Sequence, residues 1–287
     1  MDTDAAVWEG ASAATWRERW RVPEVRLLAR TGSTNDVARL LAAAGAPAGA
    51  VVIADEQTAG RGRFGRRWIA PPGRALLMTV LLRPGRTPAD RVPSVAPIRI
   101  GLAVANVIER VTGIATTLKW PNDVLVPGHG KVAGILCEAG TEPSDGAWVV
   151  AGIGINTGQH PAELHSEPPR SAASIRSVTG EPGDRRAIAA NLLDALRPFD
   201  LRNLEPLLDH ELDAYARRDA LRGHTVDVDG RRGIVDGLDR DGALRLRTAA
   251  GVEIVRSGSV RLAEPPTATI RQNGTATDGH PQPESRA

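Results

Sequence analysis

The sequence has few of the residues that signal secretion, membrane insertion or metal binding. A single cysteine, Cys137, excludes an intramolecular disulfide framework and fits a reducing compartment. The acidic start MDTDAAVWEG lacks the apolar core of a signal peptide, and no apolar run approaches the roughly 20 residues that span a bilayer. The six histidines show no metal-ligand spacing. We therefore expect a soluble, cytoplasmic protein with no membrane partner and no metal-binding residues.

Lysine is almost absent, since only Lys119 and Lys131 stand beside 34 arginines. One interpretation of the arginine excess is a genome rich in arginine codons, in which the two lysines remain by chance. The functional interpretation is that a compact ammonium acts as a point charge where a forked guanidinium fits poorly. Both lysines lie in one stretch, LKWPNDVLVPGHGKVAGIL at 118–136. This stretch therefore indicates a site that binds a carboxylate or a phosphate group.

The charge balance does not by itself indicate a nucleic-acid partner. The formal charge at pH 7 is only +2, and 34 acidic residues are spread through the chain. The hydrophobic content of 41% and charged content of 24% are ordinary for a globular protein. A length of 287 residues suits one large domain and a small one.

The first 220 residues predict an α+β domain around a mixed or antiparallel sheet. Apolar runs typical of strands occur at 24–30, 50–55, 75–83, 116–120, 123–126, 131–140 and 147–156. Helical patterns occur at 16–20, 32–45, 93–113 and 184–217. The later strands follow one another through short turns, whereas parallel neighbours need crossover helices. Ser33 or Thr34 is expected to cap the second helix by accepting from its first N–H groups.

The C-terminal part changes in character. Residues 222–264 contain four or five short strands with Gly/Asp turns, which is too little for a sandwich and fits a small SH3-like barrel. Residues 265–287 are polar and rich in Pro, Gly and Thr, which predicts disorder. We expect a catalytic domain at 1–220, a barrel at 221–264 and a disordered tail at 265–287.

The segment 60–68 concentrates four arginines and three glycines between two expected strands. Glycine lets the backbone approach a ligand closely, and backbone N–H groups with guanidinium forks can cradle an anion. A solvated hairpin loop and an RGG-like nucleic-acid segment are alternatives. A disordered RGG tract is not normally inserted between two buried strands, which counts against the second alternative.

Five motifs follow one another along the chain: GSTN at 32–35, QTAGRGRFGRRW at 57–68, KWPND at 119–123, GKVAGILCE at 130–138 and GIGIN at 152–156. Their order resembles the signature set of biotin protein ligases, over roughly residues 24–263. The resemblance implies a class II synthetase-like fold closed by the small barrel. It implies that biotin and ATP form biotinyl-5′-AMP, and that the biotinyl group then passes to a lysine of the biotin carboxyl carrier domain of an acyl-CoA carboxylase.

The resemblance also assigns residues. Around biotin it puts Ser33, Thr34, Asn35, Gln57, Arg61, Gly62, Arg63 and Lys131. Around ATP or the adenylate it puts Arg61, Arg66, Trp68, Lys119, Asn122 and Asn156. The proposed catalytic residues are Lys131, Arg63 and Asp123. Cations and a Mg²⁺ on the phosphates would offset the repulsion between carboxylate and α-phosphate. Asp123 would orient or deprotonate the incoming amine, which is mostly protonated at pH 7.

Each motif also has a purely structural interpretation. KWPND could be a strand end with a Pro turn, GIGIN a closely packed strand, Trp68 a core aromatic, and Cys137 a small buried residue. Two departures from the family pattern are visible. Phe64 stands where many relatives have a third arginine, and an unusual turn, Pro127–Gly130, precedes Lys131.

Two rival functions stay open at this point. A lipoate or octanoyl ligase shares the fold, but it would lack the loop at 60–68 and would admit an unbranched C8 chain. A nucleic-acid-binding module would use that loop and needs a broad basic face. Only about 30 residues precede GSTN, without a helix-turn-helix pattern, so we expect the monofunctional type of ligase that binds no specific DNA. A homodimer stays open.

Overall fold

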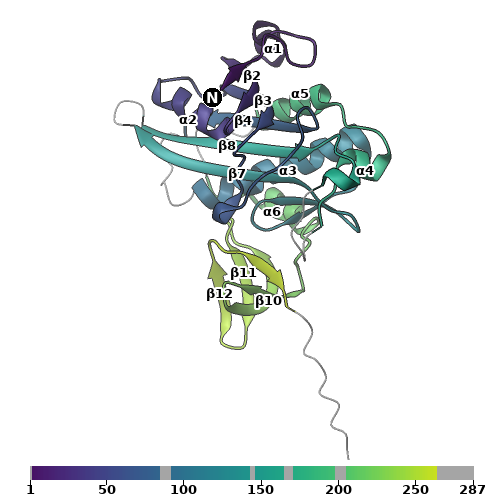
Figure 1. Cartoon of the computed structure of the whole chain (residues 1–287). Coiled ribbons are helices and arrows are strands. Elements are labelled where there is room, and N and C mark those ends of the chain that lie inside the picture. Colours follow the sequence, from purple (N-terminus) through teal and green to yellow (C-terminus); the bar gives the residue numbers. More distant parts are fainter. Residues whose placement is uncertain (1, 85–91, 143–145, 165–170, 198–204, 264–287) are drawn as a thin grey trace, which may run out of the picture.

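In a computed structural model, the described residues are 2–84, 92–142, 146–164, 171–197 and 205–263. They form a large sheet flanked by helices and a smaller sheet that follows it in the chain (Figure 1). The observed class is therefore α+β, as predicted. The tail expected at 265–287 lies outside the described residues.

The large sheet has eight strands and is mixed. Its spatial order is β1 (Thr3–Asp4), β2 (Val25–Thr31), β3 (Val51–Gln57), β4 (Ala75–Leu82), β8 (Gly146–Asn156), β7 (Gly130–Glu142), β6 (Asp123–Val126) and β5 (Thr117–Lys119). Only the pair β2–β3 is parallel, and α2 connects these two strands. Every other pair is antiparallel, which confirms the mixed sheet.

Helices cover both faces of this sheet. They are α1 (Ala13–Trp20), α2 (Thr34–Ala43), α3 (Val92–Thr112), α4 (Ile175–Thr179), α5 (Arg185–Leu196) and α6 (Asp209–Ala216), with short 3-10 turns at Arg63–Gly65 and Pro161–Glu163. The prediction of one continuous helix over 184–217 is wrong, because residues 205–208 are not helical. Pro206 has no N–H to donate, and Leu207 N donates instead to Arg240 O at 2.6 Å.

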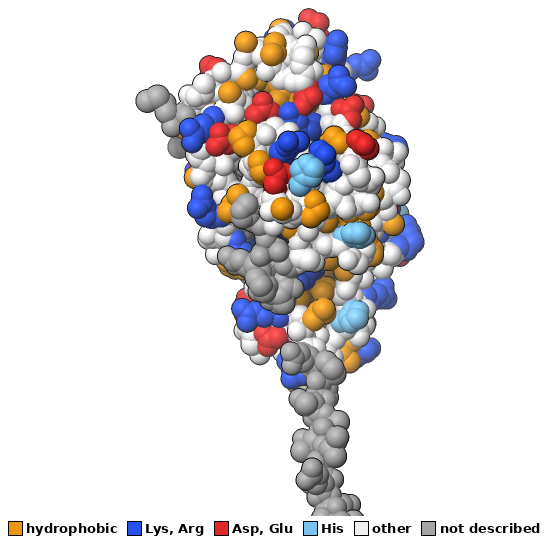
Figure 2. Space-filling view, turned by 45° about the vertical axis from the view of Figure 1, so that its right-hand side comes forward, with side chains coloured by type: hydrophobic (Ala, Val, Ile, Leu, Met, Phe, Trp, Pro, Cys, Tyr) orange, Lys and Arg blue, Asp and Glu red, His pale blue; other side chains and the backbone are white. Residues whose placement is uncertain are grey.

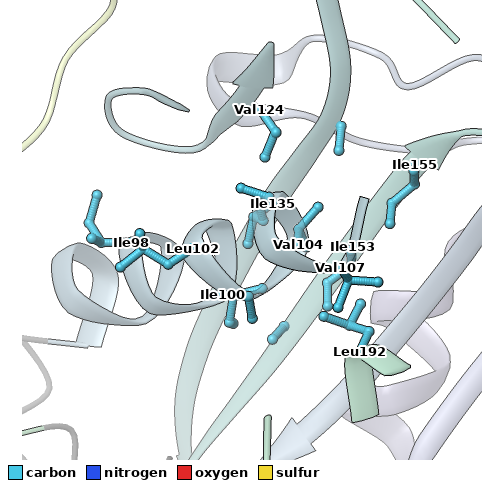
Figure 3. Packing of buried hydrophobic residues seen from close by; sticks show 14 of the residues in the cluster. Ile98, Ile100, Leu102, Val104, Val107, Val124, Ile135, Ile153, Ile155 and Leu192 are labelled. Atoms are coloured by element: carbon cyan, nitrogen blue, oxygen red, sulfur yellow. The ribbon is translucent and has the colours of Figure 1, made fainter. Parts of the chain in front are cut away.

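The central strand β4 shows how the two faces differ. All eight of its residues are buried. Leu76, Met78 and Val80 point to the face that packs against α3 and α5, where Figure 3 shows the side chains of α3 against those of β6, β7 and β8. Successive side chains of a strand alternate, so Leu77, Thr79 and Leu81 point to the α2 face. That second face carries the site.

The smaller sheet is antiparallel and has the order β12 (Gly251–Val255), β11 (Leu244–Thr248), β10 (Arg231–Leu238), β9 (Thr225–Val228) and β13 (Val260–Leu262). Trp120 of the KWPND motif ties it to the large sheet. Its indole is buried, and Nε1 donates to Gly242 O at 3.0 Å. The β5–β6 turn thus rests against the smaller sheet.

A carboxyl group is buried where α6 leads into the smaller sheet. Asp219 Oδ1 accepts from Leu221 N at 2.8 Å, whereas Oδ2 is buried without a hydrogen-bond partner among the described residues. Burial raises the pKa of Asp219. The folded protein therefore binds this proton more tightly than the unfolded chain, and stability should fall as pH rises from about 4 through the raised pKa.

Replacing this carboxyl group tests that linkage. Relative to wild type, Asp219→Asn should gain free energy of unfolding between pH 4 and pH 7, because the amide carries no charge into the buried site. Urea unfolding at several pH values measures the difference. Asp213→Asn, at an exposed position of α6, is the control. A difference between Asp219→Asn and wild type that does not change with pH would contradict the assignment.

Candidate functional site

Two adjoining cavities over the α2 face of the large sheet collect the predicted site residues. The first cavity has a volume of about 450 Å³, part of it open to solvent. Its lining includes Ser33, Thr34, Asn35, Gln57, Arg61, Gly62, Trp68, Asn122 and Lys131 from the predicted set, with Leu77, Gly134, Ile135, Leu136, Gly152, Ile153 and Gly154. Seven of the eight residues assigned to biotin therefore surround one space.

The second cavity has a volume of about 290 Å³. It is lined by Arg63, Phe64, Arg66, Lys119, Trp120, Pro121, Asn122, Asp123, Gly258, Ser259 and Val260. Asn122 lines both cavities, so the two spaces meet at the β5–β6 turn. The remaining cationic and acidic residues of the predicted site lie here.

Bare backbone forms the floor of the first cavity. Gly134 on β7 lies opposite Gly154 on β8 in the strand pairing. A Cβ at Gly134 would stand 2.7 Å from Lys131 Nζ, and one at Gly154 would stand 2.6 Å from Trp68 Cε2. Glycine in a strand often marks such a close approach. The side chains of Lys131 and Trp68 thus fit only because these two positions have no side chain.

A chain of hydrogen bonds forms the polar wall beside α2. Gln57 Oε1, at the end of β3, accepts from Thr34 N at 2.8 Å and Thr34 Oγ1 at 3.0 Å. Ser33 occupies the N-cap position without a capping hydrogen bond from its side chain. The expected cap by Ser33 or Thr34 is therefore wrong, because Gln57 from the neighbouring strand supplies the acceptor. Thr79 Oγ1 continues the chain, 2.8 Å from both Thr34 Oγ1 and Asn35 Oδ1.

Two carboxylates hold Arg61 at the rim of the first cavity. Its guanidinium contacts Asp36 on α2 and Glu138 on β7. The hydrogen bond from Arg61 holds the pKa of Asp36 below its usual range. Asp36, Glu138 and Thr79 were not among the predicted site residues. Thr79 does leave a signal, since it is the one polar residue within the apolar run ALLMTVLL.

Lys131 and Asp123 form an ion pair near the junction of the cavities. Lys131 Nζ lies 2.5 Å from Asp123 Oδ1 and 5.5 Å from the centre of the Trp68 ring. Lys131 is the second residue of β7 and lines the first cavity, whereas Asp123 is the first residue of β6 and lines the second. One scarce lysine therefore reaches between the two spaces, as a point charge can.

The smaller sheet contributes to the second cavity. Arg66 Nη2 donates to Ser259 Oγ at 3.0 Å, so the loop at 60–68 contacts the segment before β13. Phe64 has a positive φ of 58° and is 60% exposed, with the guanidinium carbons of Arg63 and Arg66 4.9 and 5.8 Å from its ring centre. Burial lowers the pKa of Arg63, against the attraction of Asp123. Nothing in the sequence signalled the part played by residues 258–260.

Asn156 is the one predicted residue that lines neither cavity. Its Nδ2 donates to Ala173 O at 2.9 Å, and its Oδ1 accepts from Gln159 Nε2 at 2.7 Å. The side chain is buried and its hydrogen bonds are made within the protein. Cys137 is partly buried against the core, and burial raises the pKa of its thiol to about 12. No helix within the described residues is long and apolar enough to cross a membrane.

The polar wall yields a test of stability. Thr79→Val removes the hydroxyl that faces Asn35 Oδ1, leaving that buried oxygen without this partner, so the free energy of unfolding should fall by roughly 1–3 kcal/mol. Thr141→Val, at an exposed position of β7, should change it by less than about 0.5 kcal/mol. Urea unfolding checks both variants. Equal effects of the two substitutions would show that the wall does not depend on Thr79.

The chain is similar to known proteins over most of its length. A profile of the Biotin/lipoate A/B protein ligase family matches residues 27–156. These residues contain all the predicted site residues, but not the smaller sheet.

Similarity to individual proteins extends further along the chain. The biotin–[acetyl-CoA-carboxylase] ligase of Paracoccus denitrificans is 38% identical over 248 residues, which cover 82% of this chain and 98% of that protein. The ligase of the same name from Mycobacterium tuberculosis is 35% identical over 252 residues, which cover 84% of this chain and 89% of that protein. The bifunctional ligase/repressor BirA of Bacillus subtilis is 34% identical over 235 residues, which cover 80% of this chain and 71% of that protein.

The fold is also similar to that of a solved structure. The biotin protein ligase from Aquifex aeolicus in complex with biotin and ATP superposes with a TM-score of 0.67 at 27% identity, covering 84% of this chain and all of that one.

Proposed function

The chain belongs to the biotin/lipoate A/B protein ligase family, and on that premise we propose that it activates biotin with ATP and transfers the biotinyl group to a carrier protein. The enzyme is an ATP-dependent, AMP-forming biotin–protein ligase. The observation that carries this function is the pair of cavities that meet at Asn122, one lined by the predicted biotin residues and the other by cations.

Biotin belongs in the first cavity. Its ureido ring offers N–H donors and a carbonyl acceptor, and the polar wall of Ser33, Thr34 and Gln57 offers matching groups. Because Gln57 Oε1 already accepts twice from Thr34, its amide Nε2 is the group that can donate to a ligand. Leu77, Ile153 and the glycine floor suit the apolar part of biotin.

The nucleotide belongs in the second cavity. Arg63, Arg66 and Lys119 bring positive charge to a space beside the carboxylate end of biotin. Such positioned cations lower the cost of bringing a carboxylate to the α-phosphate, and bond formation there releases pyrophosphate. Trp68, which the resemblance assigns to the adenylate, lines the first cavity and would contact the adenylate from that side. Asn156 is a weaker part of the proposal, since its amide is used within the protein.

Mg²⁺ is part of the same proposal. No group of three or more His, Cys, Asp or Glu side chains that could hold a metal ion occurs in the described part of the chain. Mg²⁺ is commonly held by substrate phosphates and water with few protein ligands, so a nucleotide-borne ion fits this cavity. When bound, it would neutralise phosphate charge.

Transfer to the carrier uses the same junction. The incoming lysine amine must lose a proton before it attacks the acyl carbon of biotinyl-5′-AMP, with AMP as the leaving group. Asp123 can accept that proton once the amine replaces the ammonium of Lys131 at its carboxylate. Lys131 is then available to the phosphate of the departing AMP.

The acceptor is the biotin carboxyl carrier domain of an acyl-CoA carboxylase, in keeping with the names of the relatives from Paracoccus and Mycobacterium. We also propose that the smaller sheet is an SH3-like barrel, that the large domain has a class II synthetase-like fold, and that the protein is cytoplasmic. A homodimer and the lack of specific DNA binding remain predictions. On the face that Figure 2 shows, acidic and basic side chains are interspersed, which gives a nucleic-acid module little support.

The main rival, a lipoate or octanoyl ligase, makes a different prediction. An unbranched acyl chain offers no hydrogen-bond acceptor to Gln57 Nε2, the donor of the polar wall that is left for a ligand. ATP–pyrophosphate exchange should therefore depend on biotin and not on lipoate or octanoate. Exchange that depends on lipoate and ignores biotin would exclude the proposed function.

Lys131 gives the sharpest test within the site. Lys131→Ala should fold and lose about 2–4 kcal/mol of transition-state stabilisation, or roughly 10²–10³ in the rate of biotin-dependent exchange. Lys131→Arg should recover little, because a fork does not fit where Gly134 leaves room for an ammonium. Arg67→Gln removes a cation of the same loop that lines neither cavity and should stay within about twofold of wild type. Near-wild-type exchange in both Lys131 variants would remove Lys131 from the mechanism.

A further inference from the structure

Arg61 is the arginine in the lining of the first cavity, and its guanidinium is held by two carboxylates. Nη1 donates to Asp36 Oδ2 at 2.7 Å and Nη2 donates to Asp36 Oδ1 at 2.9 Å, which is a two-pronged pair. Nη2 also donates to Glu138 Oε2 at 3.2 Å. The three side chains come from the loop at 60–68, from α2 and from β7. Arg61 therefore joins three separate elements at the cavity rim.

These contacts fix how the guanidinium is presented. An arginine has five N–H donors in a rigid plane. Both hydrogens of Nη2 and one of Nη1 are directed at the two carboxylates, so Nε–H and the second Nη1–H are left for a ligand. Forked pairing fixes the plane of the guanidinium as well as its position. The carboxylates thus fix the position and the plane in which Arg61 meets a ligand.

Glu138 orients a second residue of the same cavity. Its Oε2 accepts from Asn35 Nδ2 at 2.7 Å, and Leu136 O accepts from the same amide at 3.2 Å. On its other side, Asn35 Oδ1 faces the hydroxyl of Thr79 at 2.8 Å. The amide of Asn35 therefore has one orientation, and the carboxylate that fixes it also holds Arg61.

We propose that Asp36 and Glu138 are positioning residues of the ligase, which hold Arg61 and the Asn35 amide in the orientation that binds biotin before the substrate arrives. This inference rests on the proposed function, since it names how that site is prepared. Neither carboxylate lines the first cavity, so both act through residues that do. The advantage is in binding: a preoriented side chain loses less conformational freedom when the ligand is bound.

A positioning role predicts a specific kinetic pattern. Asp36→Asn keeps the size of the side chain but removes the charge that pairs with Arg61. It should raise the KM for biotin in ATP–pyrophosphate exchange about tenfold and change kcat by less than about twofold, because ground-state binding of biotin is weakened. Glu138→Gln should also raise the KM for biotin, because a glutamine amide can accept through one oxygen only and carries no charge to hold Arg61.

A double-mutant cycle separates positioning from a merely structural effect. If Asp36 acts through Arg61, then Asp36→Asn should have little further effect on the KM for biotin in an Arg61→Gln background. Thermal unfolding of each variant verifies that it is folded. Arg39→Gln is the matched control, because Arg39 pairs with Asp36 from the solvent side and does not line the cavity. It should leave KM within about twofold of wild type.

The outcomes distinguish this inference from the function on which it rests. If Asp36→Asn raises the KM for biotin as much in the Arg61→Gln background as in wild type, the positioning role is overturned. A fall in the KM for biotin in Asp36→Asn alone would also overturn it, because it would mean that Asp36 competes with the ligand for Arg61. If Asp36→Asn does not fold, the same cycle with Glu138→Gln decides. Wild-type protein without biotin-dependent exchange would instead overturn the proposed function itself.

Discussion

The site depends on a patch of bare backbone in the middle of the large sheet. Gly134 and Gly154 face each other across β7 and β8, and Gly152 lies one step further along β8. A Cβ at Gly154 would lie 2.6 Å from the Trp68 ring, and one at Gly134 would displace the ammonium end of Lys131. A sheet that is otherwise covered by α2 and α3 thereby keeps an open space on its α2 face, where two cavities meet. The ligand site is in this sense a local absence of side chains within a well-packed core.

Polar groups around that space are held by one another rather than by solvent. Gln57 closes the N-terminus of α2, Thr79 fixes Asn35, and Asp36 and Glu138 hold Arg61. Such preorganised groups do not have to be reoriented when charge develops in the reaction. The three tryptophans of the N-terminal segment, Trp8, Trp16 and Trp20, serve a different end. In the core on the opposite face of the sheet, Trp16 and Trp20 stack on each other and Trp8 meets both rings edge-on.

The sequence was a good guide wherever the signal is local. The periodicity of α3 and the apolar run of β4 could be predicted, because each depends on neighbours within a few residues, whereas the residues that line the first cavity were assigned through the resemblance to biotin protein ligases. Contacts between distant segments could not. No local pattern shows that Gln57 caps α2, that Ser259 contacts Arg66, or that the amide of Asn156 is used within the protein. The helix expected over 184–217 is interrupted for a local reason, because Pro206 has no N–H to donate within a helix.

The central claim is that one ligand, biotinyl-5′-AMP, occupies both cavities at once across Asn122. A crystal structure of the protein with this adenylate tests the claim most directly. The account predicts the biotinyl ring against Gln57 and Thr34 on the glycine floor, and the AMP group among Arg63, Arg66 and Lys119. The phosphate should lie within reach of Lys131 between them. An adenylate bound elsewhere, or one whose nucleotide lies in the first cavity, would contradict the account.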